Sequence, residues 1–277
     1  MIDRETKIKS DAAENQWPFA MGHLENSKLT PHTASWRTDA IREYTANLDA
    51  MLEASQTRKL YPGANRMPLD KGRLRWGPSL WKVLAKRRTV REFSSRPIPW
   101  SVISTLIHSA AGITGFALIP NSADIRQNLR AWPSGGGLYP LELYPVLLEG
   151  PHAGAYHYDP VDSVLECLKP GHLRDRIRPH ILTIAQELDA PLLFLLSGRL
   201  DRTMKKYGER GYRFVWLEAG HLAQNLILAS VAKGLSTCPL GGFHDDAIRE
   251  TLSIDNDETI LYAIAVGFPN GNGRSQL

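Results

Sequence analysis

The chain has 277 residues, of which 43% are hydrophobic and 22% are charged, and its formal net charge is +4. That composition is typical of a globular protein with one large core or two modest ones. Its two cysteines, Cys167 and Cys238, form no Cys-x-x-Cys motif, and no His-Glu-x-x-His motif occurs. These absences argue against a disulfide framework and a structural zinc site. We expect no metal, and the cysteine content favours a reducing cytoplasm.

The sequence predicts no targeting or membrane segment. The first seven residues are mostly charged and lack the apolar core of a signal peptide. The longest apolar stretch, 214–231, is interrupted by four polar residues at helical spacing, Glu218, His221, Gln224 and Asn225. This pattern indicates a buried helix, and we expect its polar stripe to make buried hydrogen bonds or to face a ligand cavity or a dimer interface.

Residues 1–78 are predicted to form an arm and a helix that wrap a partner subunit. The helix is expected over 38–56, where apolar residues recur at helical spacing. Eleven Lys and Arg residues lie between Arg58 and Arg91, against the single acidic residue Asp70. The excess favours an anionic ligand or an acidic protein partner, although a solvated face has the same pattern. Nucleic acid is not expected, because no recognised nucleic-acid module is visible.

Residues 79–277 are predicted to form the main domain. Apolar periodicity and proline or glycine punctuation separate its elements. Helices are expected at 79–88, 99–115, 173–187, 211–235 and 245–253, and strands at 141–149, 155–158, 164–168, 190–200 and 259–268. A block of helices around mostly meandering strands indicates an α+β fold.

An arginine-rich motif, Arg87-Arg88-Thr89-Val90-Arg91, follows the first of these helices. In an extended segment alternate side chains share a face, which would place Arg87, Thr89 and Arg91 together. Two guanidinium groups and a hydroxyl form a suitable clamp for a phosphate, because arginine offers paired donors and stays charged. The alternative is a row of surface ion pairs.

A glycine-rich segment, 132–140, contains three glycines between two prolines and leads into an apolar strand. Such a run gives up conformational entropy, so its backbone is expected to lie against something that leaves no room for a β-carbon. A tight turn before the strand is one explanation. The other is a flat cofactor ring held by main-chain groups of Pro133, Ser134, Gly135 and Gly136.

A second glycine pair lies in Pro239-Leu240-Gly241-Gly242, directly after the long helix. Main-chain donors there are suited to a heteroaromatic nitrogen or a carbonyl oxygen. Arg274, near the end of the chain, offers one more cation for a phosphate. Neither a Walker loop nor a dinucleotide-binding glycine motif occurs, so the sequence predicts phosphate and ring binding without a Rossmann or P-loop domain.

In this order and at these separations, the motifs Arg-Arg-Thr-x-Arg, Pro-Ser-Gly-Gly-Gly-x-Tyr-Pro and Cys-Pro-Leu-Gly-Gly-Phe resemble the nitroreductase superfamily of FMN enzymes, and within it the SagB-type azoline oxidases. The resemblance covers most of the chain from about residue 20 and implies an intertwined homodimer with a central, mostly antiparallel sheet flanked by helices. It also implies that Arg87, Thr89 and Arg91, assisted by Arg274, hold the phosphate and ribityl chain of FMN.

The same resemblance assigns the two glycine-rich segments to the flavin ring. Pro133 to Gly136 would line the isoalloxazine from the second subunit, and Pro239 to Gly242 would place a main-chain donor near its N5 atom. Some azoline oxidases have an adjacent Lys-Tyr pair that transfers protons, and the resemblance implies the same role for Lys206 and Tyr207. Aromatisation of an azoline removes a proton and a hydride, and a desolvated lysine beside a phenol can accept the proton. Lys205 is the second candidate for this base, and an ordinary basic surface is the alternative.

These features predict an FMN-dependent, homodimeric azoline dehydrogenase that converts thiazolines or oxazolines into thiazoles or oxazoles and is reoxidised by dioxygen. Its substrate would be a peptide on a ribosomal precursor or on a carrier protein, within a biosynthetic complex. An NAD(P)H-dependent nitro- or quinone reductase of the same fold is one alternative. A non-catalytic, flavin-stabilised scaffold subunit is another.

Overall fold

An antiparallel sheet forms the centre of the molecule. The computed structural model describes residues 18–55, 58–70, 77–119, 125–182 and 189–270, so Arg274 lies outside the described residues. Eight strands follow the order β1, β7, β6, β5, β8, β10, β2, with β9 also paired to β10, and each of these pairs is antiparallel. They are β1 (Asn65–Pro68), β2 (Phe93–Ser94), β5 (Leu141–Leu147), β6 (Gly154–Asp159), β7 (Val164–Pro170), β8 (Leu192–Gly198), β9 (Ser236–Leu240) and β10 (Thr259–Pro269).

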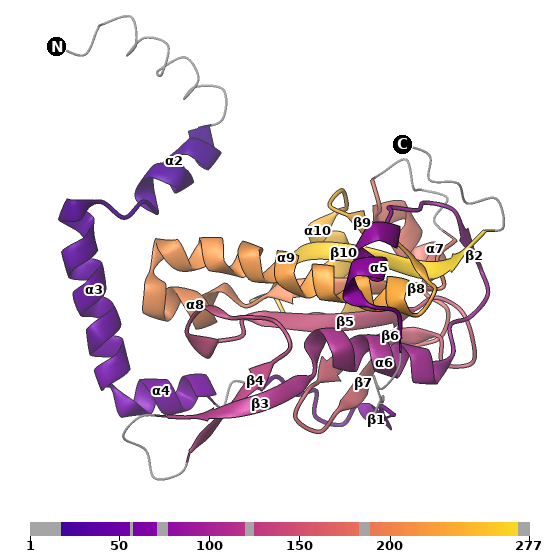
Figure 1. Ribbon diagram of the computed structural model, residues 1–277, viewed down its shortest axis with the longest axis horizontal. Helices are drawn as coiled ribbons and strands as arrows, with labels where there is room; N and C mark the ends of the chain where they lie inside the picture. Colours follow the sequence, from indigo (N-terminus) through magenta and orange to yellow (C-terminus); the bar gives the residue numbers. More distant parts are fainter. Residues whose placement is uncertain (1–17, 56–57, 71–76, 120–124, 183–188, 271–277) are drawn as a thin grey trace, which may run out of the picture.

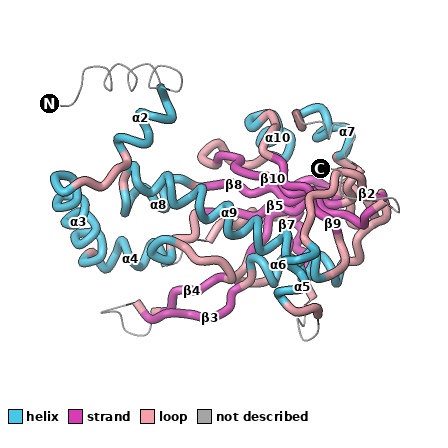
Figure 2. The backbone as a smooth tube through the Cα atoms, turned by 45° about the horizontal axis from the view of Figure 1, so that its top comes forward, coloured by secondary structure: helices cyan, strands magenta, loops and turns pink. Residues whose placement is uncertain are grey.

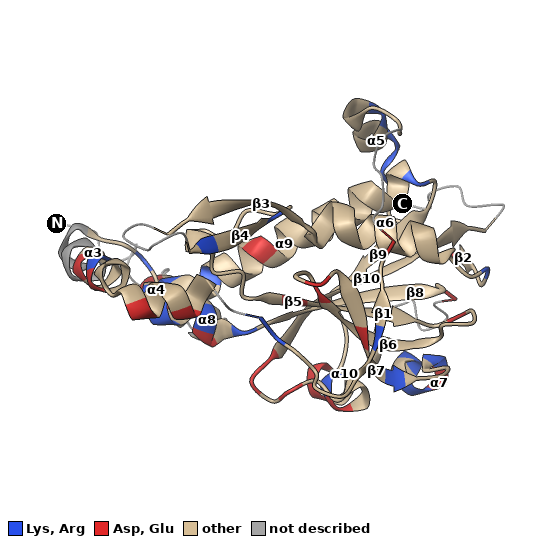
Figure 3. Cartoon of the chain, turned by 90° about the horizontal axis from the view of Figure 1, so that it is seen from below, with Lys and Arg blue, Asp and Glu red and all other residues tan. Residues whose placement is uncertain are grey.

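Helices cover both faces of this sheet (Figure 3). One face carries α6 (Trp100–Ala111) and α9 (Glu209–Ala232), whose apolar residues share a core cluster with Leu141, Phe194 and Ile264. The other face carries α7 (Arg174–Ile177) and α10 (Asp245–Leu252) over a second cluster. Both faces of the central strands are therefore buried, which explains why β5 and β8 read as continuous apolar runs rather than as alternating ones.

The long helix α9 positions the site. It has 24 residues, which corresponds to a length of about 36 Å. A short helix, α8 (Leu200–Tyr207), precedes it and packs against its N-terminal end, while α5 (Leu80–Lys86) packs against α9 and is followed by the arginine-rich motif. Ser79 caps α5, because its hydroxyl accepts a hydrogen bond from the Lys82 amide.

An N-terminal arm projects from the body of the molecule (Figure 1). It contains α2 (Pro18–Asn26), α3 (Pro31–Ala46) and α4 (Leu48–Ser55), and α3 contacts α8. A two-stranded hairpin of β3 (Ile113–Leu118) and β4 (Arg126–Arg130) extends beside α4, separate from the main sheet (Figure 2). The arm and the hairpin enclose the region in which α8 meets the glycine-rich segment.

The expected α+β class and the antiparallel sheet are confirmed, and the described residues contain no helix long and apolar enough to cross a membrane. Three local expectations were wrong. The helix expected over 38–56 is two helices that meet at Asn47, whose side chain accepts a hydrogen bond from the Ala50 amide. The helix expected over 173–187 is helical at Arg174–Ile177 and continues as a 3-10 turn to His180, because Pro179 cannot donate into an α-helix, and residues 183–187 lie outside the described residues. The helix expected over 99–115 ends at Ala111, and β3 begins at Ile113.

Candidate functional site

The glycine-rich segment forms a tight 3-10 turn, Gly135–Gly137, directly before β5. Gly136 and Gly137 have φ values of 67° and 69°, which L-residues with a side chain rarely adopt. A β-carbon on Gly136 would lie 2.6 Å from the Tyr207 hydroxyl and 2.8 Å from Nζ of Lys206. The segment is therefore the tight turn of the first explanation, and side chains of the same chain fill the space beside its glycines.

Lys206 and Tyr207 thus lie against Gly136, and we call Ser134, Gly135, Gly136, Lys206 and Tyr207 the glycine–lysine cluster. The two side chains come from the last turn of α8. Tyr207 packs edge-on against Phe214 of α9, with 5.0 Å between ring centres, and the Phe214 ring in turn covers Gly135.

Burial shifts both pKa values in the direction that proton transfer from a substrate requires. Desolvation lowers the pKa of Lys206, which makes the neutral amine accessible, and it raises the pKa of Tyr207, which keeps the phenol protonated. Nζ of Lys206 lies 5.3 Å from the centre of the Tyr207 ring and 5.6 Å from that of Tyr44 in α3. Lys205 instead points to an exposed ion pair with Glu53. These features favour Lys206 over Lys205 as the base.

A buried carboxyl group supports the glycine turn from behind. Glu218 accepts hydrogen bonds from the Ser134 hydroxyl at 2.9 Å, the Gly135 amide at 3.0 Å and the Trp132 indole at 3.4 Å. Burial raises its pKa to about 7, despite these three donors. The buried hydrogen bonding expected for the polar stripe of α9 is confirmed for Glu218 and for Asn225, which donates to the Ala131 carbonyl. Helical spacing alone does not predict that Glu218 lies under the glycine turn.

The arginine-rich motif lies beside β9, and we call Arg87, Thr89, Arg91 and the β9 residues the arginine cluster. Thr89 forms a parallel bridge with Thr237, and the Val90 amide donates to the Thr237 carbonyl. Arg88 turns back to the carbonyl oxygens of Ala85 and Arg87, as expected if Arg87 and Arg91 share the other face. Within the described residues, neither Arg87 nor Arg91 has an acidic partner, so both guanidinium groups are available to an anion.

The second glycine pair belongs to the same end of the molecule. Pro239 and Leu240 lie within β9, paired with Ile264 and Ala263 of β10. The Gly242 carbonyl accepts a hydrogen bond from the Leu182 amide. A β-carbon on Gly241 would have no neighbour within 4 Å, and the residue is exposed.

One chain does not bring these two clusters together. Leu141 pairs with Gly198 at the end of the sheet from which the glycine turn and α8 emerge. Thr237 pairs with Val266, which pairs with Leu192 at the opposite end. Strands β5 and β8, which connect the two ends of the sheet, have seven residues each and span about 20 Å. Within one chain, the two clusters therefore lie at opposite ends of the sheet.

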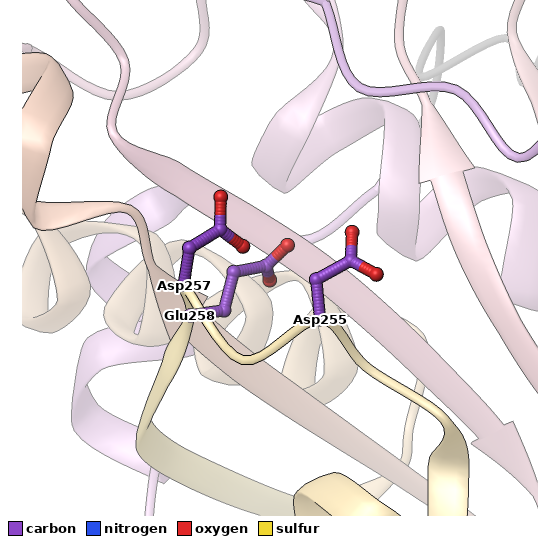
Figure 4. A group of neighbouring side chains, drawn as sticks. All are labelled: Asp255, Asp257 and Glu258. Atoms are coloured by element: carbon purple, nitrogen blue, oxygen red, sulfur yellow. The ribbon is translucent and has the colours of Figure 1, made fainter.

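Three carboxylates, Asp255, Asp257 and Glu258, point in one direction before β10 (Figure 4). Each already has a cationic partner. Lys59 contacts Asp255 at 3.0 Å and also binds Glu258, and Arg199 binds Asp257 at 2.5 Å. Tyr144 and Ser197 donate to Glu258 as well. This group is an ion-pair network that joins Lys59 to the sheet, in which Glu258 is buried while Asp255 and Asp257 are exposed.

The fold described above is that of the nitroreductases. The nitroreductase family model matches residues 84–268, and the chain belongs to this family. The chain is 33% identical over 190 residues to Putative nitroreductase MJ1384 of Methanocaldococcus jannaschii, covering 66% of this chain and 88% of that protein. It is 29% identical over 143 residues to the microcin B17-processing protein McbC of Escherichia coli, covering 49% of this chain and 52% of McbC.

Solved structures agree with this assignment. A putative nitroreductase from Anabaena variabilis superposes with a TM-score of 0.65 at 26% identity, covering 77% of this chain and 44% of that one. A chain of the E. coli microcin synthetase complex McbBCD, with truncated pro-MccB17 bound, superposes with a TM-score of 0.57 at 21% identity, covering 82% and 86%. The chain thus spans about half the length of McbC and less than half of the Anabaena protein.

Members of the nitroreductase family generally bind flavin, and the residues present fit FMN. Arg87 and Arg91 offer unpaired donors for its phosphate, and the backbone at Gly241 is exposed. The residues that the sequence analysis assigned to this site thus lie in two separate clusters, and Arg274 lies outside the described residues.

Proposed function

We propose that this protein is an FMN-dependent azoline oxidase that aromatises thiazoline or oxazoline rings in a peptide. The observation that carries the proposal is the contact of Lys206 and Tyr207 with Gly136 in the glycine turn. A family member that only accepts hydride from a nicotinamide has no need of a desolvated amine at that position. The relationship to a microcin-processing protein supports the same reading.

The chain's own residues handle the proton in this proposal. Neutral Lys206 accepts the proton from the ring carbon, and the C–H electron pair forms the new ring double bond. Tyr207 remains protonated and donates a hydrogen bond to the ring heteroatom or to the amine. FMN, when bound, supplies the acceptor for the hydride that leaves the neighbouring ring atom, and dioxygen restores its oxidised form. One substrate loses two hydrogens in total, as a proton and a hydride.

We further propose that the site forms between two copies of the chain, with the arginine cluster of one copy and the glycine–lysine cluster of the other. The separation of the two clusters at opposite ends of the sheet supports this arrangement. Large apolar side chains on the outside of the described elements support association as well: Trp81 on α5 is 78% exposed, and Leu217 on α9 is 60% exposed.

A peptide substrate and partner proteins follow from the related complex. The McbBCD structure contains a bound pro-peptide, and we propose that this protein acts in a comparable biosynthetic assembly in the cytoplasm. The substrate could arrive on a precursor peptide or on a carrier protein, and the basic residues near the arm suit an acidic partner.

The test is anaerobic mixing of FMN-loaded protein with a thiazoline-containing peptide, followed by flavin absorbance and mass spectrometry. We expect bleaching of the flavin and a product lighter by two hydrogens. Bleaching by NADPH alone, with no change in the peptide, would instead establish a nitro- or quinone reductase. Flavin-loaded protein that oxidises neither, yet is required by a partner enzyme, would establish a scaffold subunit.

A further inference from the structure

A cavity lies behind the glycine turn, between the β3–β4 hairpin and α4. Its volume is about 220 Å³. Three arginines line it together with amide side chains and an apolar wall, and no carboxylate lines it. The lining residues used below are Arg58, Arg126, Gln127, Arg130, Gly137 and Tyr139. Figure 3 shows the basic residues on β4.

Two of the three arginines, Arg126 and Arg130, form no ion pair within the described residues. Arg58 is neutralised, because its guanidinium binds Asp159 and Asp162. Arg126 and Arg130 lie four residues apart on β4, where alternation places them on the same face. Within the described ranges, neither makes an ion pair or a side-chain hydrogen bond.

Arg130 is held in position by aromatic rings instead of by an acid. Its guanidinium lies 5.2 Å from the ring centre of Trp132 and 5.1 Å from that of Tyr139. Burial lowers the pKa of this guanidinium, against the opposing effect of the nearby Glu142 carboxylate. The neighbouring carboxylate of Glu142 is already bound by Arg202 at 2.7 Å and by His157 at 3.0 Å. A half-buried, preoriented guanidinium without a partner is costly unless an anion neutralises it.

The cavity also adjoins the glycine–lysine cluster. Gln127 donates to the Gly137 carbonyl at 2.5 Å, and a β-carbon on Gly137 would lie 2.6 Å from the Gln127 amide nitrogen. Gly137 thus forms a wall of the cavity, while the preceding residue, Gly136, contacts Lys206. Trp132, which stacks on Arg130, donates to Glu218 under the same turn.

We propose that this cavity is a binding site for one acidic group, a carboxylate or a phosphate, held by Arg126 and Arg130. It goes beyond the flavin site, because it lies behind the glycine turn and away from the arginine cluster that we assign to FMN. That the acidic group belongs to the substrate, next to the ring to be oxidised, rests on the proposed function. Anion binding itself does not, so it can be measured without turnover.

The experiment uses the full chain labelled with 5-fluorotryptophan, and it follows the ¹⁹F resonance of Trp132, assigned by its loss in Trp132→Phe. Sodium acetate and inorganic phosphate are titrated separately at constant ionic strength set with chloride. We expect a saturable shift of that resonance with at least one of the two anions. Affinity should fall at least tenfold in Arg126→Gln and in Arg130→Gln, and should be unchanged in Arg176→Gln, which removes an exposed arginine of α7.

The preferred anion identifies the acidic group, since tighter binding of acetate indicates a carboxylate and tighter binding of phosphate indicates a phosphate. Arg126 is exposed, so Arg126→Gln should fold normally even if Arg130→Gln does not. A resonance that does not move, that responds equally to chloride, or that shifts alike in Arg126→Gln and wild type would overturn the proposal. Failure of the thiazoline assay with intact anion binding would refute only the catalytic function.

Discussion

Gly136 and Lys206 are packed so closely that a β-carbon on the glycine would come within 2.8 Å of the lysine amine. Gly136→Ala is therefore expected to displace Lys206 and Tyr207 and to abolish azoline oxidation while FMN still binds. The left-handed backbone adds a stability loss of about 1–2 kcal/mol. Thermal unfolding and turnover measure the two effects. Gly220→Ala is the matched control, because its β-carbon would meet nothing within 4 Å and should stabilise α9.

Removal of the proposed base should slow the chemical step. Lys206→Ala is expected to lower kcat by about 100- to 10,000-fold with flavin content unchanged, and Tyr207→Phe should have a smaller effect. Because only the neutral amine accepts a proton, kcat of the wild type should rise with pH through a pKa below the ordinary lysine value of 10.5. This rise of kcat with pH should be absent in Lys206→Ala.

Lys205→Ala is the control for this pair, since Lys205 forms an exposed ion pair with Glu53. Its kcat should stay near that of the wild type. Normal turnover by Lys206→Ala, or a large loss in Lys205→Ala alone, would show that the base has been misassigned.

Mixed dimers test whether two chains build one site. Arg91→Gln chains should lack a good phosphate site and Lys206→Ala chains should lack the base, so each homodimer should be poorly active. A heterodimer of the two variants contains one site with both wild-type halves, and co-expression should restore activity toward half that of the wild type. No recovery in a verified heterodimer would place both clusters in the same site of a single chain.

The arginine cluster should determine FMN affinity unevenly along the motif. Arg87→Gln and Arg91→Gln are each expected to weaken FMN binding by about 10- to 100-fold, because a charged hydrogen bond contributes about 1.5–3 kcal/mol. Arg88→Gln should have little effect, since Arg88 donates to main-chain carbonyls of its own helix. Fluorescence titration of the apoprotein with FMN gives the three dissociation constants, and equal losses in all three would argue against the clamp.

Glu218 should make stability depend on pH. The unfolded chain releases this proton near pH 4.5, whereas the folded protein holds it to about pH 7. The folded state therefore binds more protons between these values, and the free energy of unfolding should fall by about 3 kcal/mol as the pH rises through them. Glu218→Gln should lack this part of the fall. Glu250→Gln, at an exposed position of α10, should retain it.

His157 also has a raised pKa, because Glu142 and Glu166 hydrogen-bond to it against the effect of burial. Its stabilising contribution is present below its unfolded pKa and is lost as the pH rises through the higher folded value. Since this contribution is common to all three proteins, the difference between wild type and Glu218→Gln isolates Glu218. If the free energies of unfolding of wild type and Glu218→Gln changed equally with pH, the pKa assignment of Glu218 would be wrong.

Short-range chemistry made much of this molecule predictable from its sequence. The apolar residues of β5 and β8 and the periodicity of α9 depend on neighbours in the chain. The contacts that define the site depend on long-range register. Nothing near Glu218 in the sequence indicates that it lies under Ser134, and α8 is too short and too polar to be recognised by apolar periodicity. The opposite placement of the two clusters likewise follows from strand pairing.

The buried ion pair between Lys59 and Glu258 determines where a stable fragment of this protein can begin. The family match begins at residue 84, yet Glu258, which is fully buried at its side chain, is neutralised by Lys59. A fragment cut at the family boundary would leave that carboxylate inside the protein without its counter-ion, and such orphaned charges cost about 3–5 kcal/mol. The smallest autonomous folding unit therefore starts upstream of Lys59, well before the homology does.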